Sequence, residues 1–210
     1  MSARAFAMQR AAATRIATSA PVALLFLLFG AANLAQWGVT HQPIGLGATA
    51  LELLVATLFV ARRSAWLVSK APLAWAAAAV GTFGMLAARP AYAPVAGLEP
   101  LYLGLQIVGA VFAGVALLSL GRSFGLVAAN RGIRTGGQYR FVRHPVYSGY
   151  VVTWIGYLLE NPSLRNACVL VVVMAFQAVR IVEEERTLGT DPVYQAYCRR
   201  VRSRVVPHLF

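Results

Sequence analysis

Residues 143–186 read RHPVYSGYVVTWIGYLLENPSLRNACVLVVVMAFQAVRIVEEER. Two apolar runs, Val146–Leu159 and Leu164–Val182, are separated by the short segment Glu160–Ser163, whose composition is typical of a turn between antiparallel helices. The second run is long enough to cross a bilayer as a helix, which takes about 20 apolar residues. The stretch therefore predicts a helical hairpin, in which the residues before the first run lie beside those after the second.

The rest of the chain contains further apolar runs of this length. Of the 210 residues, 59% are apolar and only 12% are charged, which excludes an ordinary soluble domain and intrinsic disorder. With the hairpin, these runs predict an all-α, polytopic membrane helix bundle of about six transmembrane helices. The further runs are Pro21–Val39, Ile44–Ala61, Pro72–Ala88 and Leu101–Leu120.

The distribution of positive charge predicts how the helices are oriented. The chain has 19 Lys and Arg residues against 7 Asp and Glu residues, a formal net charge of +12. Cytoplasmic loops of membrane proteins carry an excess of Lys and Arg. If the N-terminus is cytoplasmic, every cation except Arg89 and Arg165 falls on the cytoplasmic side. We therefore predict a multi-pass protein with cytoplasmic N- and C-termini. Because topology explains the charge, no nucleic acid is expected as a partner.

A basic amphipathic helix is predicted near the C-terminus. Asp191 suits an N-cap and Pro192 suits the first helical position. Tyr194, Tyr197 and Val201 follow on one side of this helix. Such a helix is typical of segments that lie against a membrane surface or cover a pocket. Four arginines lie largely on its other sides: Arg199, Arg200, Arg202 and Arg204.

Ionisable residues gather where the predicted hairpin meets the cytoplasm. Pro145 suits the first turn of a helix, which places His144 at the mouth of the hairpin and Tyr147 just inside it. We expect Arg143, His144 and Tyr147 to meet the acidic residues at the end of the second run. Two structural alternatives stay open, namely an interfacial belt of aromatic and basic residues and glutamates that only balance arginines. The acidic residues are Glu183, Glu184 and Glu185.

These motifs resemble a known superfamily. Tyr139–Gly149 (YRFVRHPVYSG) precede the hairpin, and Glu184–Arg186 and Tyr194-x-x-Tyr197 follow it. This order is similar to the C-terminal half of the isoprenylcysteine carboxyl methyltransferase and phospholipid methyltransferase superfamily, integral membrane enzymes that use S-adenosylmethionine. One departure is Gln138, where the family usually has a proline. The resemblance implies four transmembrane helices on the substrate side (1–120) and a cofactor-binding part (121–210).

The resemblance also implies a site for S-adenosylmethionine on the cytoplasmic face. The catalytic residues stay unassigned, with Arg143 and Glu185 as candidates. No metal site is predicted, because the three histidines are scattered and neither cysteine has a potential ligand near it in sequence. The residues implied for cofactor binding are Tyr139, Arg143, His144, Pro145, Tyr147, Gly149, Glu184 and Glu185.

The implied reaction transfers a methyl group to a lipophilic or membrane-delivered acceptor, which is a carboxylate, an amine or a thiol. Carboxylates suit the amino group and ribose hydroxyls of the cofactor, while His or Arg suits its carboxylate. The expected partners are this lipophilic or small-molecule substrate and membrane lipid. Two other functions stay open: an NADPH-dependent membrane reductase of the sterol-reductase type, and a non-enzymatic transporter or scaffold. The sequence does not specify the acceptor or the oligomeric state.

Overall fold

The computed structural model describes residues 3–90 and 96–207, with side chains from residue 19 onward. The described part is built almost entirely of helices, so the predicted all-α class is confirmed. The chain forms two compact units, Met1–Ser64 and Ala65–Phe210. The predicted division at residue 120 separates a substrate side from a cofactor-binding part, and it stays a prediction.

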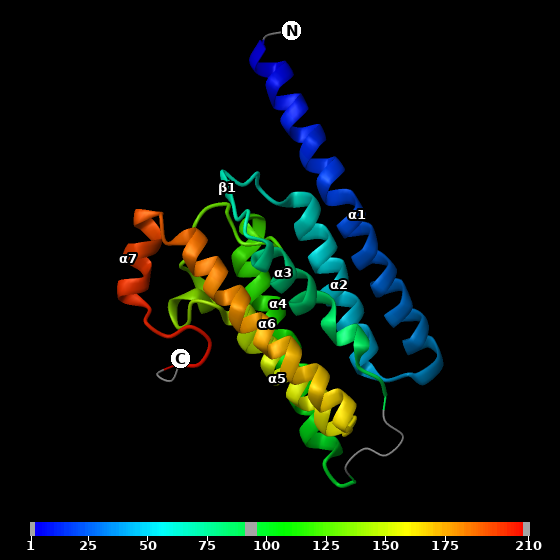
Figure 1. Ribbon diagram of the computed structural model, residues 1–210. Coiled ribbons are helices and arrows are strands. Elements are labelled where there is room, and N and C mark those ends of the chain that lie inside the picture. The colour runs from blue at the N-terminus through cyan, green and yellow to red at the C-terminus, as the bar shows by residue number, and fades with distance from the viewer. Residues whose placement is uncertain (1–2, 91–95, 208–210) are drawn as a thin grey trace. The chain divides into compact units, whose positions relative to one another are not determined.

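The first unit is a helical hairpin of α1 (Ala3–Thr40) and α2 (Pro43–Ala61) (Figure 1). The rings of Phe26 and Phe59 stack between the two helices with their centroids 5.8 Å apart. Outward-facing leucines such as Leu28 stay exposed, as expected for helices whose outer surface meets lipid. Both apolar runs predicted for this part of the chain are therefore helical.

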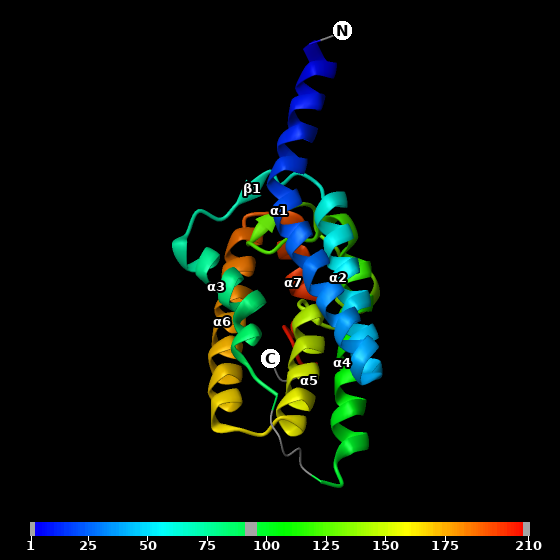
Figure 2. The ribbon, with the colours of Figure 1, turned by 90° about the vertical axis from the view of Figure 1, so that its right-hand side faces the viewer.

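The second unit contains the predicted hairpin and two further long helices. Figures 1 and 2 show α3, α4, α5 and α6 running side by side, with α7 at one end of this unit. Two very short antiparallel strands, β1 (Leu67–Val68) and β2 (Ala129–Asn130), join loops at that end. The helices are α3 (Pro72–Phe83), α4 (Glu99–Leu120), α5 (Pro145–Glu160), α6 (Leu164–Leu188) and α7 (Pro192–Arg200), with 3-10 turns at Gly84–Ala87, Gly121–Ser123 and Gly137–Arg140.

Among the described residues, four helical segments are long and apolar enough to cross a membrane. The predicted polytopic membrane bundle is therefore confirmed as a fold class, while the number of six crossings stays a prediction. The third predicted run is a 12-residue α-helix that tightens into a 3-10 turn, and α5 has 16 residues. The four segments are Ser19–Thr40, Pro43–Ala61, Glu99–Ser123 and Leu164–Leu188.

Small residues let α4 and α5 approach each other closely. A Cβ on Gly109 would lie 2.5 Å from the backbone nitrogen of Thr153, and one on Gly149 would lie 2.6 Å from that of Ala113. Any side chain at either glycine would therefore collide with backbone, which cannot move aside locally. Helix contacts of this kind are typical of membrane bundles.

The predicted hairpin of α5 and α6 is confirmed, and its turn is held by side chains. The Ser163 hydroxyl accepts a hydrogen bond from the Asn166 backbone nitrogen at 3.1 Å and so caps α6. The Asn166 amide donates to the Asn161 carbonyl at 2.8 Å. Because the two helices are antiparallel, the start of α5 and the end of α6 lie at the same end of the unit (Figure 2). Helix α6 continues past Val182, so its glutamates lie on regular helix.

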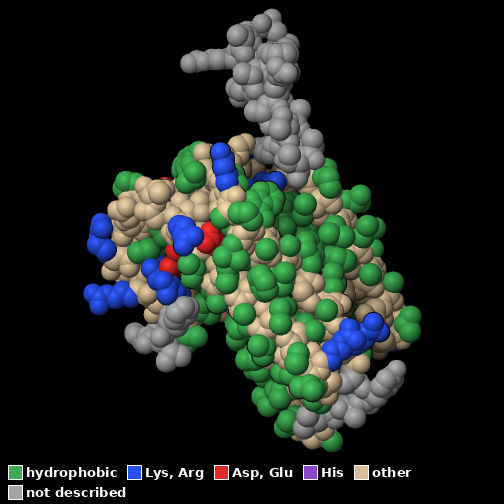
Figure 3. All heavy atoms as spheres, in the orientation of Figure 1, with side chains coloured by type: hydrophobic (Ala, Val, Ile, Leu, Met, Phe, Trp, Pro, Cys, Tyr) green, Lys and Arg blue, Asp and Glu red, His purple; other side chains and the backbone are tan. Residues whose placement is uncertain are grey.

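The surface of the second unit divides into an apolar part and a charged end. Figure 3 shows hydrophobic side chains along the visible side of this unit, and acidic side chains beside basic ones near α7. Exposed aliphatic side chains on α6, including Val171 and Val172, contribute to the apolar part. This arrangement suits a helix pair that crosses lipid and carries its polar site at one end.

Candidate functional site

The start of α5 is fixed by proline and by the C-terminal segment. Pro145 takes the first helical position and His144 the cap position, as predicted. The backbone nitrogen of Arg143 donates to the Ser203 carbonyl at 3.0 Å, and that of His144 donates to the Arg204 carbonyl at 2.8 Å. These bonds tie the residues before α5 to the C-terminal segment, and the side chains of Arg143 and His144 reach the end of α6.

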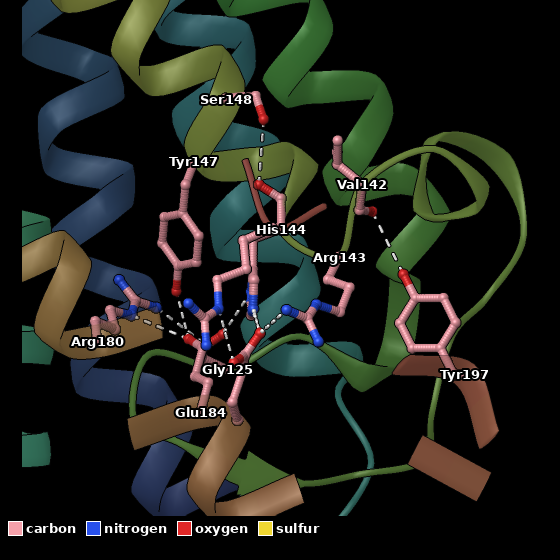
Figure 4. A network of polar contacts seen from close by, with 11 residues as sticks. Gly125, Val142, Arg143, His144, Tyr147, Ser148, Arg180, Glu184 and Tyr197 are labelled. Carbon is pink, nitrogen blue, oxygen red and sulfur yellow. Dashed lines mark hydrogen bonds and ion pairs between the residues drawn. The ribbon is translucent and has the colours of Figure 1, made fainter. Parts of the chain in front are cut away.

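Six side chains from α5, α6 and the preceding loop form one network, here called the ionic cluster. Figure 4 shows His144 and Tyr147 directed toward Glu184, with Arg180 on the far side, and Arg143 reaching toward the same end of α6. The predicted meeting of the hairpin ends is therefore confirmed, although only two of the three glutamates take part. The members of the ionic cluster are Arg143, His144, Tyr147, Arg180, Glu184 and Glu185.

Both oxygens of Glu184 have partners in the cluster. The Tyr147 hydroxyl donates a short hydrogen bond to Oε1, and the Arg180 Nε donates to the same oxygen at 3.2 Å. The His144 Nδ1 lies 3.6 Å from Oε2. Since Tyr147 and His144 are buried, Glu184 is held in one orientation by groups that water barely reaches.

Glu185 is also bound on both oxygens. Its Oε1 lies 3.1 Å from the Arg143 Nη2 and 3.3 Å from the His144 Nε2. Its Oε2 accepts a hydrogen bond from the Arg204 Nε at 3.0 Å. His144 thus bridges the two carboxylates, one at each ring nitrogen.

Arg180 is the functional candidate that sequence reasoning missed. From the sequence, Arg180 is only one of the cations that predict the cytoplasmic side, yet its side chain is buried in the cluster. Besides Glu184, its guanidinium donates to the Thr82 hydroxyl and to the Gly125 carbonyl, each at 3.3 Å. The available signal was the spacing, because an arginine four residues before a glutamate in an apolar helix shares its face.

The electrostatics of the cluster favour a protonated histidine. Burial alone lowers the pKa of His144, but hydrogen bonds and charge from Glu184 and Glu185 outweigh it, so the net pKa lies above the ordinary value. A charged imidazole between two carboxylates is the arrangement that these contacts stabilise. The cluster is therefore a network of alternating charges rather than a set of isolated ions.

The other predicted site residues have different surroundings. Glu183 turns away and pairs with Arg186 at 2.8 Å. Gly149 packs against α4, and Pro145 is buried at the first turn of α5. The Tyr139 ring is buried, and its carbonyl accepts a hydrogen bond from the Tyr197 hydroxyl at 2.6 Å.

The predicted C-terminal helix is present as α7, but it ends at Arg200, so Val201, Arg202 and Arg204 lie beyond it and not on it as predicted. The tyrosines of α7 support the site. Tyr194 and Tyr197 pack with Tyr139 and Val201 in one apolar cluster. Asp191 caps α7 by accepting from the Val193 nitrogen at 2.8 Å. Its other oxygen accepts a 2.8 Å hydrogen bond from the Asn130 amide, which lowers the Asp191 pKa. The tyrosines thus tie α7 to the residues before α5.

The cluster offers charged donors and acceptors for a polar ligand at the end of an apolar bundle. Its carboxylates suit cationic or hydroxyl groups, and its guanidinium groups suit carboxylates. Within the described residues, no group of three or more His, Cys, Asp or Glu side chains is placed to hold a metal ion.

Fold and site together define a class: helical membrane proteins with several apolar helices and a buried ionic site at one end of a hairpin. Residues 102–190 match the model of the isoprenylcysteine carboxyl methyltransferase (ICMT) family. This match includes all of α5, α6 and the ionic cluster. The predicted resemblance to the ICMT-like membrane methyltransferase superfamily is thus confirmed for this part of the chain.

Two curated proteins are similar to about half of this chain. The chain is 38% identical over 108 residues to protein-S-isoprenylcysteine O-methyltransferase A of Arabidopsis thaliana, which covers 47% of this chain and 54% of that protein. It is 34% identical over 115 residues to a probable protein-S-isoprenylcysteine O-methyltransferase of Oryza sativa subsp. indica, covering 49% and 59%. The chain thus spans about half the length of the curated relatives it matches.

One solved structure is also similar in part. It is that of the eukaryotic intramembrane Ras methyltransferase ICMT, with a TM-score of 0.48 and 20% sequence identity. The alignment covers 93% of this chain and 77% of that one.

Proposed function

We propose that this protein is a membrane methyltransferase that transfers a methyl group from S-adenosylmethionine to a lipophilic carboxylate. The observation that carries the proposal is the pair Glu184 and Glu185, held by His144 at the end of an apolar helix inside the family match. Two adjacent carboxylates in such a place are costly unless they serve a ligand or a network.

The residues of the cluster fit the proposed cofactor. Two carboxylates suit its amino group and ribose hydroxyls, and guanidinium groups suit its carboxylate. When bound, the cofactor supplies a methyl group on a cationic sulfur. We assign the cationic side of the cofactor to Glu184 and Glu185, and we assign Tyr147 and His144 to hold these carboxylates in place. Arg143 then acts on Glu185 as a positioning residue.

The charge balance favours an anionic acceptor. Three guanidinium groups, those of Arg143, Arg180 and Arg204, face only two carboxylates, so the site has a surplus of positive charge. A cationic cofactor increases that surplus, and a carboxylate acceptor reduces it. The relatives are named O-methyltransferases, which agrees with an oxygen nucleophile rather than an amine or a thiol.

Arg180 is the residue that we assign to the acceptor. Its guanidinium is buried and reaches Glu184, Thr82 and Gly125, so it is rigidly held. With cofactor and acceptor bound, transfer of the methyl group from sulfur to a carboxylate oxygen would give an ester and a neutral thioether. No proton moves, so the site needs no general base. Burial of the cluster excludes water and favours a reaction that neutralises charge.

Methyl transfer can be tested with the protein in lipid nanodiscs. The probe is labelled S-adenosylmethionine with a prenylated cysteine carboxylate as acceptor, and the matched control acceptor is the corresponding amide. We expect label in the ester product only with the carboxylate. Arg180→Gln should reduce transfer by about 100-fold, since a buried charged partner is lost. Glu160→Gln, at the far end of α5, should leave transfer unchanged.

The same preparation separates the alternative functions. S-adenosylmethionine and NADPH are titrated in turn by calorimetry. Binding of NADPH without binding of S-adenosylmethionine would support a reductase and overturn the proposal. Binding of neither cofactor would instead favour a transporter or scaffold.

A further inference from the structure

The segment after α7 passes the start of α5 as a strap of irregular backbone. This C-terminal strap, residues 201–207, pairs by main-chain hydrogen bonds with Arg143 and His144. A third bond comes from the Ser148 hydroxyl, which donates to the Val205 carbonyl at 2.6 Å. These three hydrogen bonds fix the position of the strap along α5 and therefore the position of Arg204.

This register brings Arg204 to Glu185. The guanidinium Nε donates to Oε2 at 3.0 Å, on the oxygen opposite to the one that Arg143 and His144 hold. Each oxygen of Glu185 thus has a cationic partner from this chain. A further cation can bind Glu185 only by sharing or displacing one of them.

The three partners of Glu185 differ in how firmly they are held. The side chains of His144 and Arg143 are 6% and 12% exposed, whereas that of Arg204 is 35% exposed. Arg204 also lies in a bend outside the helices, whereas His144 and Arg143 adjoin the fixed start of α5. Ion pairs that water reaches are weak and exchange readily. Of the three partners, Arg204 is therefore the one whose separation from Glu185 requires the least free energy.

We propose that Arg204 is a built-in competitor for the cationic group of the cofactor at Glu185, and that the C-terminal strap loosens when the cofactor binds. The inference rests on the proposed function, because it assigns Glu185 to the cofactor. It adds that the chain neutralises its own site with the strap and releases it on binding. The strap then controls access to the site from the side of α7.

The test compares cofactor affinity across variants of the full-length protein in nanodiscs. S-adenosylmethionine is titrated by calorimetry into wild type, Arg204→Gln, Arg204→Lys and Arg202→Gln. Arg202 is exposed and two residues away, so its variant makes the same charge change without the contact to Glu185. We expect Arg204→Gln to bind about two- to fivefold tighter, the range for removing a partly exposed ion pair. Arg204→Lys should lie between it and wild type, and Arg202→Gln should match wild type.

A second measurement follows the strap itself. Amide hydrogen exchange of Arg143 and His144, whose N–H groups donate to the strap carbonyls, should speed up in wild type when S-adenosylmethionine is added, because the strap loosens. Unchanged or weaker binding by Arg204→Gln would overturn the proposal, as would equal tightening by Arg202→Gln or greater protection of the Arg143 and His144 amides on binding. If wild type binds no S-adenosylmethionine, the proposed function fails as well. If wild type binds it and Arg204→Gln does not differ, only the strap proposal fails.

Discussion

At the scale of single residues, the cluster depends most on Glu184, because three side chains converge on it. Replacing it with glutamine keeps the volume but leaves the buried guanidinium of Arg180 without its carboxylate. Losing one partner of a buried charge pair costs several kcal/mol, so cofactor affinity should fall at least about tenfold. Calorimetry with Glu184→Gln measures this loss. The matched control is Glu183→Gln, because Glu183 pairs outside the cluster with the exposed Arg186. Equal losses in both variants would contradict the assigned role of Glu184.

Also at this scale, His144 should make stability depend on pH. It faces Glu184 and Glu185 from α6, Arg143 from its own loop, Tyr147 from α5 and Arg204 from the strap. Its pKa is raised in the folded protein, against about 6.5 for a free histidine.

The stabilisation from charged His144 is therefore complete below pH 6.5 and is lost as the pH rises through the folded pKa. We expect Tm to fall over that window by roughly 2–4 °C for each kcal/mol lost. His144→Gln should remove this part of the pH profile, as measured by differential scanning fluorimetry in detergent. A profile that the substitution leaves intact would contradict the prediction.

At the scale of elements, the contact between α4 and α5 sets where the cluster lies. Gly149 was implied as a cofactor residue, yet it packs against the backbone of α4. Gly149→Ala should therefore lower Tm, because the added Cβ meets backbone atoms that cannot yield. At temperatures where the variant stays folded, its remaining cofactor affinity separates packing from binding. The control is Gly104→Ala on α4, where a Cβ meets nothing within 4 Å and the helix gains propensity. Equal Tm values for the two variants would contradict this packing role.

Also at the element scale, the sequence predicts the helices and where they begin better than it predicts the tertiary contacts between them. The apolar runs, Pro145 and Asp191 predicted helices and their first residues, because these depend on local chemistry. The antiparallel hairpin then predicted that Glu184 meets His144. The spacing of Arg180 and Glu184 could place both on one helix face, but the contacts of Arg180 with Thr82 and Gly125 join residues far apart in sequence, so no local pattern predicts them. The strap's pairing with Arg143 is likewise set by the tertiary fold.

At the scale of the whole molecule, the positions of the cations predict which side of the membrane each end of the hairpin faces. The ionic cluster and α7 lie at one end of the hairpin, and the turn with Arg165 lies at the other. The positive-inside distribution predicts that the first end lies in the cytoplasm. A cofactor made and consumed in the cytoplasm would then reach the cluster without crossing lipid, while a lipophilic acceptor would arrive through the bilayer.

This sidedness can be measured with single cysteines in a background carrying Cys168→Ala and Cys198→Ser. Arg199→Cys on α7 and Arg165→Cys at the hairpin turn both replace exposed arginines, so each variant is matched to the other in charge. A membrane-impermeant maleimide should label Arg199→Cys only in inverted vesicles and Arg165→Cys only in right-side-out vesicles. Labelling from one side for both would mean that the hairpin does not cross the bilayer. The reverse pattern would place the cluster outside, where it could not meet a cytoplasmic cofactor.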